Sequence, residues 1–207
     1  MIKLNYNIVS ENNHKRLNLL SSEKKKKYEV IVKSHGKNNL CKLGKSNKIP
    51  QVGDIFALSC KEGEYYLGKV LESFELYKIN VQVIVIYSQV LKDLNVDFKK
   101  FDFKNILLTP HIVFDGYWKK GLFKNIINIP LTPNDKNLDY GFFTMDPLNE
   151  YGYFVDSKEE ELDHIPQFYK IYGVSNIYAI YQSIQIEKLF REWEYVWFWI
   201  IIRISTT

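Results

Sequence analysis

The hydrophobic pattern of residues 49–207 predicts a succession of short β-strands. Apolar runs rich in β-branched and aromatic residues alternate with polar, glycine-bearing segments, which is typical of strands joined by turns. Residues 81–87 are almost continuously apolar, as expected of a strand buried on both faces. The runs interpreted as strands are residues 54–59, 65–71, 81–87, 106–114, 122–129, 140–145 and 151–155.

The glycine positions support this interpretation. Residues 61–64 have the length and the glycine of a hairpin loop, and residues 115–121 carry two glycines that suit a tight turn. Gly53 precedes a strand and is expected to let the chain turn into it. Gly68 lies inside a strand, where a glycine usually marks a bulge or a close approach of the backbone to another group.

Helical periodicity is confined to the C-terminal part of the chain. Ser175 is placed to cap a helix with one apolar face, formed by Ile177, Ile180, Tyr181 and Ile184. A strand explains this stretch almost as well up to Ser183, so a helix is expected only over residues 183–192. Residues 91–103 are ambiguous and can hold a short helix. The predicted fold class is α+β, mainly β: a strongly bent antiparallel sheet or partial barrel with one or two helices.

The two ends of the chain are expected to behave differently. Residues 1–48 are interpreted as a basic appendage to a main domain of residues 49–207, with strands near residues 2–8 and 28–32 and a turn at residues 35–39. Residues 193–204 are as strongly β-forming as any segment of the chain. Exposed, they would be an aggregation hazard, so we expect them to pair into the sheet.

Charge is divided unevenly along the chain. The first 48 residues hold 12 basic and 3 acidic side chains, and the remainder holds 16 basic and 21 acidic ones. Only three of the 28 basic residues are arginine, the residue that nucleic-acid-binding proteins favour for bidentate contacts. Lys24, Lys25, Lys26 and Lys27 are therefore interpreted as a solvated face, and nucleic acid is not the expected partner.

Compartment is inferred from cysteine usage and hydropathy. Cys41 and Cys60 form no CxxC pair, and the first residues lack the apolar core of a signal peptide. The longest apolar run, residues 195–202, is far shorter than the roughly 20 residues that span a bilayer. We expect a cytoplasmic protein that does not enter a membrane; its oligomeric state is left open.

The sequence contains no recognisable catalytic or metal-binding motif. The four histidines have no ligand spacing, and no nucleophile elbow, P-loop or dinucleotide fingerprint is present. Cys60 is interpreted as a small buried hydrophobe rather than a nucleophile. We therefore expect no enzyme, cofactor or metal. One enzyme hypothesis stays open, a site assembled from the dispersed residues Asp115, His111 and Tyr153.

Negative charge is concentrated just after an aromatic strand. A dense acidic run repels itself and stays hydrated, whereas catalytic carboxylates need partial desolvation. One interpretation is an exposed loop or helix start, and the other is an acidic patch that steers a basic partner. The acidic residues of this run are Asp156, Glu159, Glu160, Glu161 and Asp163.

Two regions resemble the immunity protein 26 family. Residues 50–58 carry Gly-Asp before an aromatic position, and residues 63–71 carry Tyr and Gly followed by the basic Lys69, where the family typically has arginine. The segment 114–121, which leads to Phe123, Lys124 and Asn128, is similar to the family's central tryptophan region. Trp118 in that segment is either a lid on the core, which we favour, or an exposed anchor. The resemblance covers roughly residues 49–189.

This resemblance implies a function in binding rather than in catalysis. Immunity proteins of bacterial polymorphic toxin systems bind a cognate toxin domain and so protect the producing cell. The alternative hypothesis is a lysine-rich nucleic-acid-binding β-barrel that uses the lysine run with exposed aromatic residues such as Tyr65 and Tyr66. The residues expected to bind the partner are Asp156, Glu159, Glu160, Glu161, Asp163, Trp118, Tyr65 and Lys69.

Overall fold

The structure is a computed structural model. It describes residues 4–5, 8–34, 40–146, 148 and 151–204, with the backbone alone described for residues 192–204. The turn expected at residues 35–39 lies outside the described residues, as do Ile2 and Tyr6 of the expected first strand.

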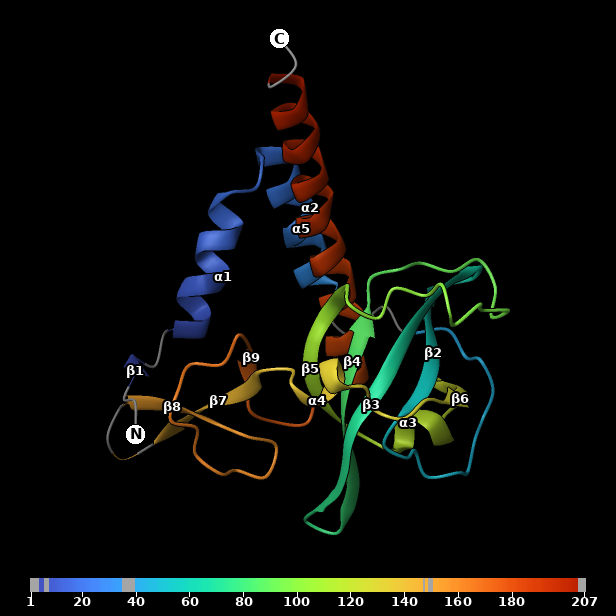
Figure 1. Cartoon of the computed structure of the whole chain (residues 1–207). Coiled ribbons are helices and arrows are strands. Elements are labelled where there is room, and N and C mark those ends of the chain that lie inside the picture. Colours follow the sequence, from blue (N-terminus) through green and yellow to red (C-terminus); the bar gives the residue numbers. More distant parts are fainter. Residues whose placement is uncertain (1–3, 6–7, 35–39, 147, 149–150, 205–207) are drawn as a thin grey trace.

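A curved five-stranded antiparallel sheet forms the larger part of the fold (Figure 1). Its order is β5-β4-β3-β2-β6. The expected strands between residues 54 and 129 are all confirmed. Their bounds are β2 (Asp54–Lys61), β3 (Glu64–Leu76), β4 (Ile79–Tyr87), β5 (Ile106–Phe114) and β6 (Lys124–Asn128). Residues 81–87 of β4 are buried, as the continuous apolar run predicted.

Gly68 confirms the expected close approach within β3. A side chain there would place Cβ 2.3 Å from Cζ of Phe56 and 2.7 Å from the carbonyl oxygen of Val85, so only glycine fits. Gly53 has a φ of +88° at the entry to β2, which is the turn expected of it. Both glycines thus fix the pairing of β2 with its neighbours.

A smaller four-stranded sheet lies beside the first, in the order β1-β8-β7-β9. β7 (Tyr140–Asp146) and β8 (Tyr151–Val155) form the expected antiparallel pair, and β9 (Phe168–Ile171) runs parallel to β7. β1 (Leu4–Asn5) adds to the edge of β8. The class α+β, mainly β, is therefore confirmed, with an open, curved main sheet.

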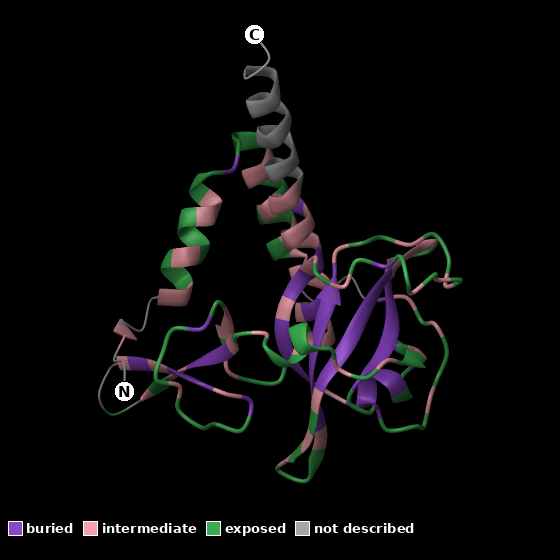
Figure 2. Ribbon diagram, viewed as in Figure 1, coloured by how far each residue is buried: buried purple, intermediate pink, exposed green. Residues whose placement is uncertain are grey.

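The five-stranded sheet is buried on both faces (Figure 2). One face packs Phe56, Leu58 and Ile84 against Trp118 and the helix residues Ile180 and Ile184. The other face packs against residues of the loop 91–103 and of the smaller sheet, including Phe101, Phe142 and Val155. That loop forms no helix; its aromatic side chains cover Tyr87 instead.

The N-terminal segment is helical where a strand was expected. α2 (Ser22–Lys33) replaces the strand expected at residues 28–32. Of the strand expected near residues 2–8, Leu4 lies in β1, whereas Ile8 begins α1 (Ile8–Asn18). The physical reason lies at the start of α2, where the Ser21 side chain accepts a hydrogen bond from the Lys24 backbone N–H. Ion pairs Glu23–Lys27 and Glu29–Lys33 then stabilise successive turns at i,i+4 spacing.

The strand expected at residues 193–204 is also wrong, because α5 (Ile177–Ile204) continues through it. The helix begins before the expected residue 183, and Asn176 rather than Ser175 caps it by accepting a hydrogen bond from Ala179 N–H. No glycine or proline interrupts residues 177–204, so helix propagation meets no break. The β-propensity of residues 193–204 depends on context. Here these residues continue a helix whose first turns pack Ile180 and Ile184 into the core.

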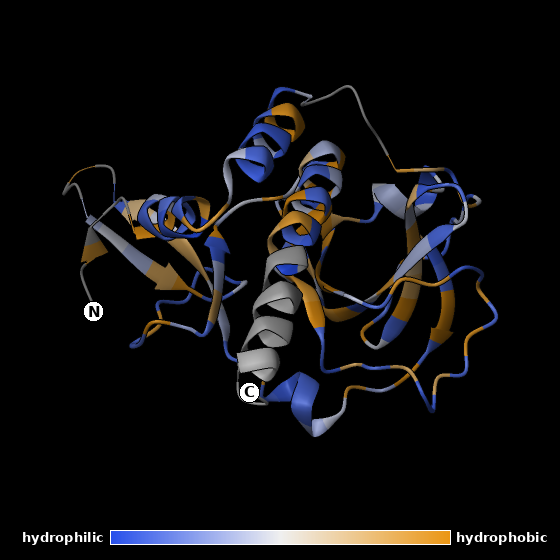
Figure 3. Ribbon diagram, turned by 90° about the horizontal axis from the view of Figure 1, so that it is seen from above, coloured by the Kyte–Doolittle hydropathy of each residue, from blue (hydrophilic) through white to orange (hydrophobic). Residues whose placement is uncertain are grey.

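The helices stand together on one side of the sheets. Viewed from above, α1 lies over the smaller sheet, and α2 lies beside α5 (Figure 3). Two short helices, α3 (Gly116–Lys119) and α4 (Pro133–Lys136), complete the fold. α3 occupies the segment expected to be a tight turn.

Candidate functional site

Three motif residues, Asp54, Trp118 and Asn128, join one hydrogen-bond network through Asn125. Asp54, only 6% exposed, accepts bonds from the side-chain amides of Asn125 and Asn128, each at 2.8 Å, and from the backbone N–H of Gln51. Asn125 in turn accepts the indole N–H of Trp118 at 2.6 Å. The network joins the start of β2 to β6 and α3, and so ties the two motif regions together.

Trp118 belongs to the core, as its favoured interpretation predicted. It is fully buried, and its ring packs edge-on against Phe56 and Phe123 at 5.1 and 4.9 Å between centroids. Such aromatic contacts add to the free energy of area burial. The side chain offers no exposed surface to a partner.

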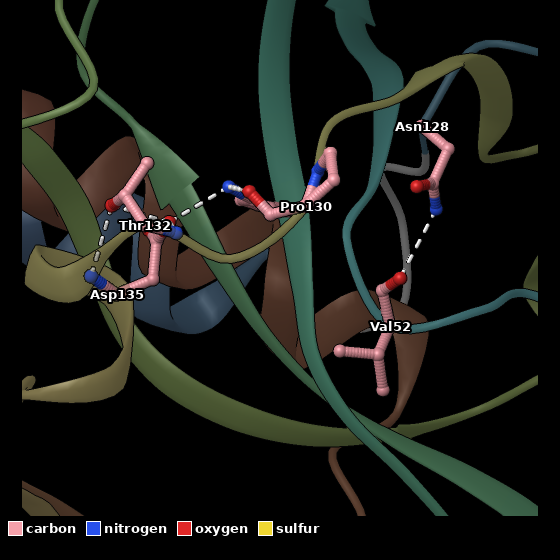
Figure 4. Close-up of polar contacts among 6 residues, drawn as sticks. Val52, Asn128, Pro130, Thr132 and Asp135 are labelled. Atoms are coloured by element: carbon pink, nitrogen blue, oxygen red, sulfur yellow. Dashed lines mark hydrogen bonds and ion pairs between the residues drawn. The ribbon is translucent and has the colours of Figure 1, made fainter.

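Lys69 is also buried, within a polar cluster on the other face of the sheet. Its ammonium donates to Oδ2 of Asp135 at 2.7 Å and to the carbonyl oxygen of Pro130 at 3.3 Å. Asp135 closes a capping box with Thr132 at the start of α4, and Asn128 reaches the Val52 carbonyl nearby (Figure 4). A lysine satisfies this site because one carboxylate oxygen is its anionic partner. Lys69 therefore holds α4 onto β3.

The expected acidic residues lie in the loop between β8 and β9, which we call the acidic loop (residues 156–163). Glu159, Glu160, Glu161 and Asp163 are exposed. Asp156 is half-buried and shapes the loop, since its Oδ1 accepts the backbone N–H groups of Lys158 and Glu160 at 2.8 and 2.9 Å. The loop is anchored by Ser157, whose hydroxyl donates to Glu72 on β3 at 2.6 Å. An anchored loop thus presents four carboxylates to solvent.

His164 lies next to two carboxylates at the end of the acidic loop. His164 contacts Asp139 at 2.9 Å and Asp163 at 3.0 Å. These hydrogen bonds, Asp139 first, raise the pKa of His164 above its usual value. From residue 139 to residue 163 the chain carries eight acidic side chains and one lysine, so the smaller sheet and its loops are strongly acidic.

The residues of the nucleic-acid hypothesis do not form one surface. The lysine run lies on α2, where Lys27 pairs with Glu23 and Lys24 reaches the Leu189 carbonyl oxygen. Tyr65 is half-buried on β3, and Tyr66 is fully buried in the core and cannot stack on a base. No specific observation favours this hypothesis.

The three residues of the enzyme hypothesis are each engaged with other groups. Asp115 pairs with Lys119 at 2.7 Å, His111 contacts Lys170, and Tyr153 lies on β8. No hydrogen bond between described residues joins the three.

Burial raises the pKa of the Cys60 thiol to about 12, which leaves it protonated and unreactive. Within the described part of the chain, no three His, Cys, Asp or Glu side chains gather as a metal site would require.

The chain matches one known protein family over the region that contains the hydrogen-bond network of Asp54 and Trp118. Residues 51–150 match the family model of immunity protein 26. The resemblance in the sequence is thereby confirmed over a shorter span than the residues 49–189 expected. A search of curated proteins and a search of solved structures each give no match.

The immunity protein 26 match ends just before β8. It contains the whole five-stranded sheet, β7, Asp54, Trp118 and the Lys69–Asp135 pair. The acidic loop, β9 and all three long helices lie outside it. Within the described residues, no helix combines the length and the apolar character needed to cross a bilayer.

Sequence reasoning missed the groups that accompany these residues. Asn125, Asp135 and Glu72 complete the buried networks but stand in no motif, and their partners are distant in sequence. The Thr132-Pro133-Asn134-Asp135 segment does carry a capping signal that predicts a short helix. This capping signal is the local sequence feature that indicates a structural role for Asp135.

Proposed function

We propose that this protein is an immunity protein that binds a cognate bacterial toxin domain and blocks it without catalysis. The match of residues 51–150 to immunity protein 26 carries this proposal. Within that match, Asp54, Trp118 and Lys69 are occupied in holding the fold, which supports a toxin-binding surface formed by other residues.

We further propose that the acidic loop forms the centre of that surface. Its exposed carboxylates would attract a toxin with a basic cleft, as a nuclease has, because complementary charge accelerates association and excludes wrong partners. Apolar side chains flank the charge: Ile165 is 47% exposed just after the loop, and Leu148 is 90% exposed on the hairpin between β7 and β8. Interfaces commonly combine apolar anchors with a charged rim.

The test measures the rate at which this protein associates with its cognate toxin domain. Replacing Glu159, Glu160 and Glu161 together by glutamine should slow association by about tenfold at low salt. The difference should shrink as added salt screens the charges. The dissociation rate should change less, because rim charges act chiefly on encounter.

A matched variant controls for net charge. Glu11, Glu62 and Glu75 are exposed and distant in sequence from the acidic loop, and their triple glutamine variant removes the same charge. It should associate at close to the wild-type rate. Equal rates for the two triple variants would contradict the acidic-loop surface, and failure of the wild-type protein to bind or protect against the toxin would contradict the function itself.

A further inference from the structure

A cleft lies where the helices meet the sheets, away from the acidic loop. Its volume is about 400 Å³, and its walls come from α1, α2, α5, β5 and β9. That volume is within the range of small-molecule sites in proteins. Apolar and aromatic side chains form much of the lining, among them Leu17, Tyr28, Leu108 and Phe190.

Lys170 of β9 is a cation without a carboxylate partner in this cleft. It contacts Nε2 of His111, whose Nδ1 lies 2.5 Å from the Thr109 carbonyl oxygen. Because that carbonyl can only accept, Nδ1 carries the proton, and Nε2 accepts from the lysine. No ion pair joins Lys170 to a carboxylate of the described residues, and His111 Nε2 is the one hydrogen-bond acceptor of its ammonium among them.

Two arginines line the same cleft. Arg16 of α1 forms a bidentate ion pair with Glu187 of α5, at 2.8 and 2.7 Å. Arg191 of α5 donates to Asn105 Oδ1 at 2.6 Å and to the Ile106 carbonyl oxygen, both uncharged. The lining therefore holds three cations and one carboxylate, and that carboxylate is already bound to Arg16. Excess positive charge beside half-buried aromatic side chains favours the binding of an anion.

We propose that this cleft binds a small organic anion, with its carboxylate or phosphate on Lys170 and Arg191 and an apolar or aromatic body against Tyr28 and Phe190. Lys170 supplies an ammonium with one acceptor among the described residues, and Arg191 supplies the three guanidinium N–H groups that do not donate to Asn105 or Ile106. The aromatic wall is already assembled, since the rings of Tyr28 and Phe190 lie 6.5 Å apart. No residue of the acidic loop lines the cleft, so this proposal does not depend on the proposed toxin-binding surface.

The test measures binding to the isolated full chain by calorimetry, with three probes that share one ring system. Naphthoate and naphthyl phosphate carry the two candidate anions, and uncharged naphthol carries none. At least one anion should bind, and about tenfold more tightly than naphthol. A preference between the two anions identifies the headgroup. No heat from either anion at millimolar concentration, or equal affinity for naphthol, would overturn the proposal.

Substitutions locate the binding. Lys170→Met keeps the length of the side chain and removes its charge, so it should weaken anion binding by about tenfold or more. Lys99→Met, at an exposed loop position, is the control and should bind as the wild type does. If the two variants bind alike, the anion lies elsewhere. A thermal melt of each variant without probe separates lost binding from lost folding.

The pH dependence of the binding affinity gives a second test of the role of Lys170. Burial lowers the pKa of Lys170 to about 8, although the nearby Glu187 opposes this. Burial, with the Lys170 charge, lowers the pKa of His111 to about 3, so the imidazole stays neutral. Affinity for naphthoate, which is ionised throughout, should therefore fall as the pH rises through about 8 and Lys170 loses its proton. The other charged or titratable groups that face Lys170 across the cleft are Arg16, Tyr28, Tyr169, Glu187 and Arg191.

An affinity that stays constant between about pH 7 and pH 9 would exclude Lys170 as the anion's partner. Lys170→Met should lose this pH dependence together with most of the affinity. Retention of the full pH dependence in that variant would contradict the assignment. Because these measurements need no toxin, their failure would leave the immunity function untouched.

Discussion

Trp118→Ala is expected to lower the free energy of unfolding by about 3–5 kcal/mol, a large share of the 5–15 kcal/mol typical of whole domains. The indole is fully buried against Phe56 and Phe123, so its removal leaves a cavity in the core. The change also deprives Asn125 of its 2.6 Å hydrogen bond. Urea denaturation of the purified variant measures the loss.

Two further variants show whether the loss of stability comes from core packing or would follow from any loss of an apolar side chain at the surface. Trp118→Phe keeps most of the ring volume and should cost less than the alanine change. Leu148→Ala, at a position that is 90% exposed, should alter stability by less than about 0.5 kcal/mol. A cost below about 1 kcal/mol for Trp118→Ala would contradict the structural role of the tryptophan motif.

Asp135→Asn is expected to cost about 3 kcal/mol or more, since it leaves the Lys69 ammonium buried without its anion. The side chains of Lys69 and Asp135 are only 2% and 11% exposed, so water cannot replace the lost partner. Asparagine keeps the shape of the aspartate and can still accept the Thr132 backbone N–H bond. Equilibrium unfolding again gives the value.

The double variant Lys69→Met with Asp135→Asn should regain most of that loss, because no unpaired charge remains. The coupling free energy from the full double-mutant cycle measures how strongly the two residues act together. Additive losses in the cycle would show that the pair does not stabilise the junction of β3 and α4.

The β-strands could be predicted because each carries its own signal. Residues 81–87 are apolar throughout, and Gly53 and Gly68 mark places where a side chain cannot fit. These features act over a few residues and need no knowledge of distant partners. The helical content could be predicted less well. Residues 28–32 and 193–204 are rich in β-branched or aromatic residues, but both lie in helices that begin at capped positions upstream.

The candidate site shows the same division. The acidic run at residues 156–163 was visible as a local concentration of charge, and its exposure follows from charge density alone. The burial of Lys69 was not predictable, because its partner Asp135 is 66 positions away. The cleft around Lys170 brings together five elements from the N-terminal, central and C-terminal parts of the chain, and no local sequence pattern predicts that they meet.

The residues that stabilise the fold differ from those proposed to bind the toxin. The residues that mark the immunity protein 26 region stabilise the five-stranded sheet, and the proposed recognition surface lies on the acidic loop outside that region. Recognition and stability would then rest on different residues. Substitutions in the loop should change toxin binding without changing the melting temperature.

Hydrogen exchange of the complex tests this account most directly. Amides of an exposed loop exchange faster than those of a buried sheet, and a bound partner slows them. With the toxin domain bound, we expect strong new protection at residues 156–165 and little change in β2, β3 and β4. New protection confined to the helices or to the five-stranded sheet, with the acidic loop still exchanging freely, would contradict the account.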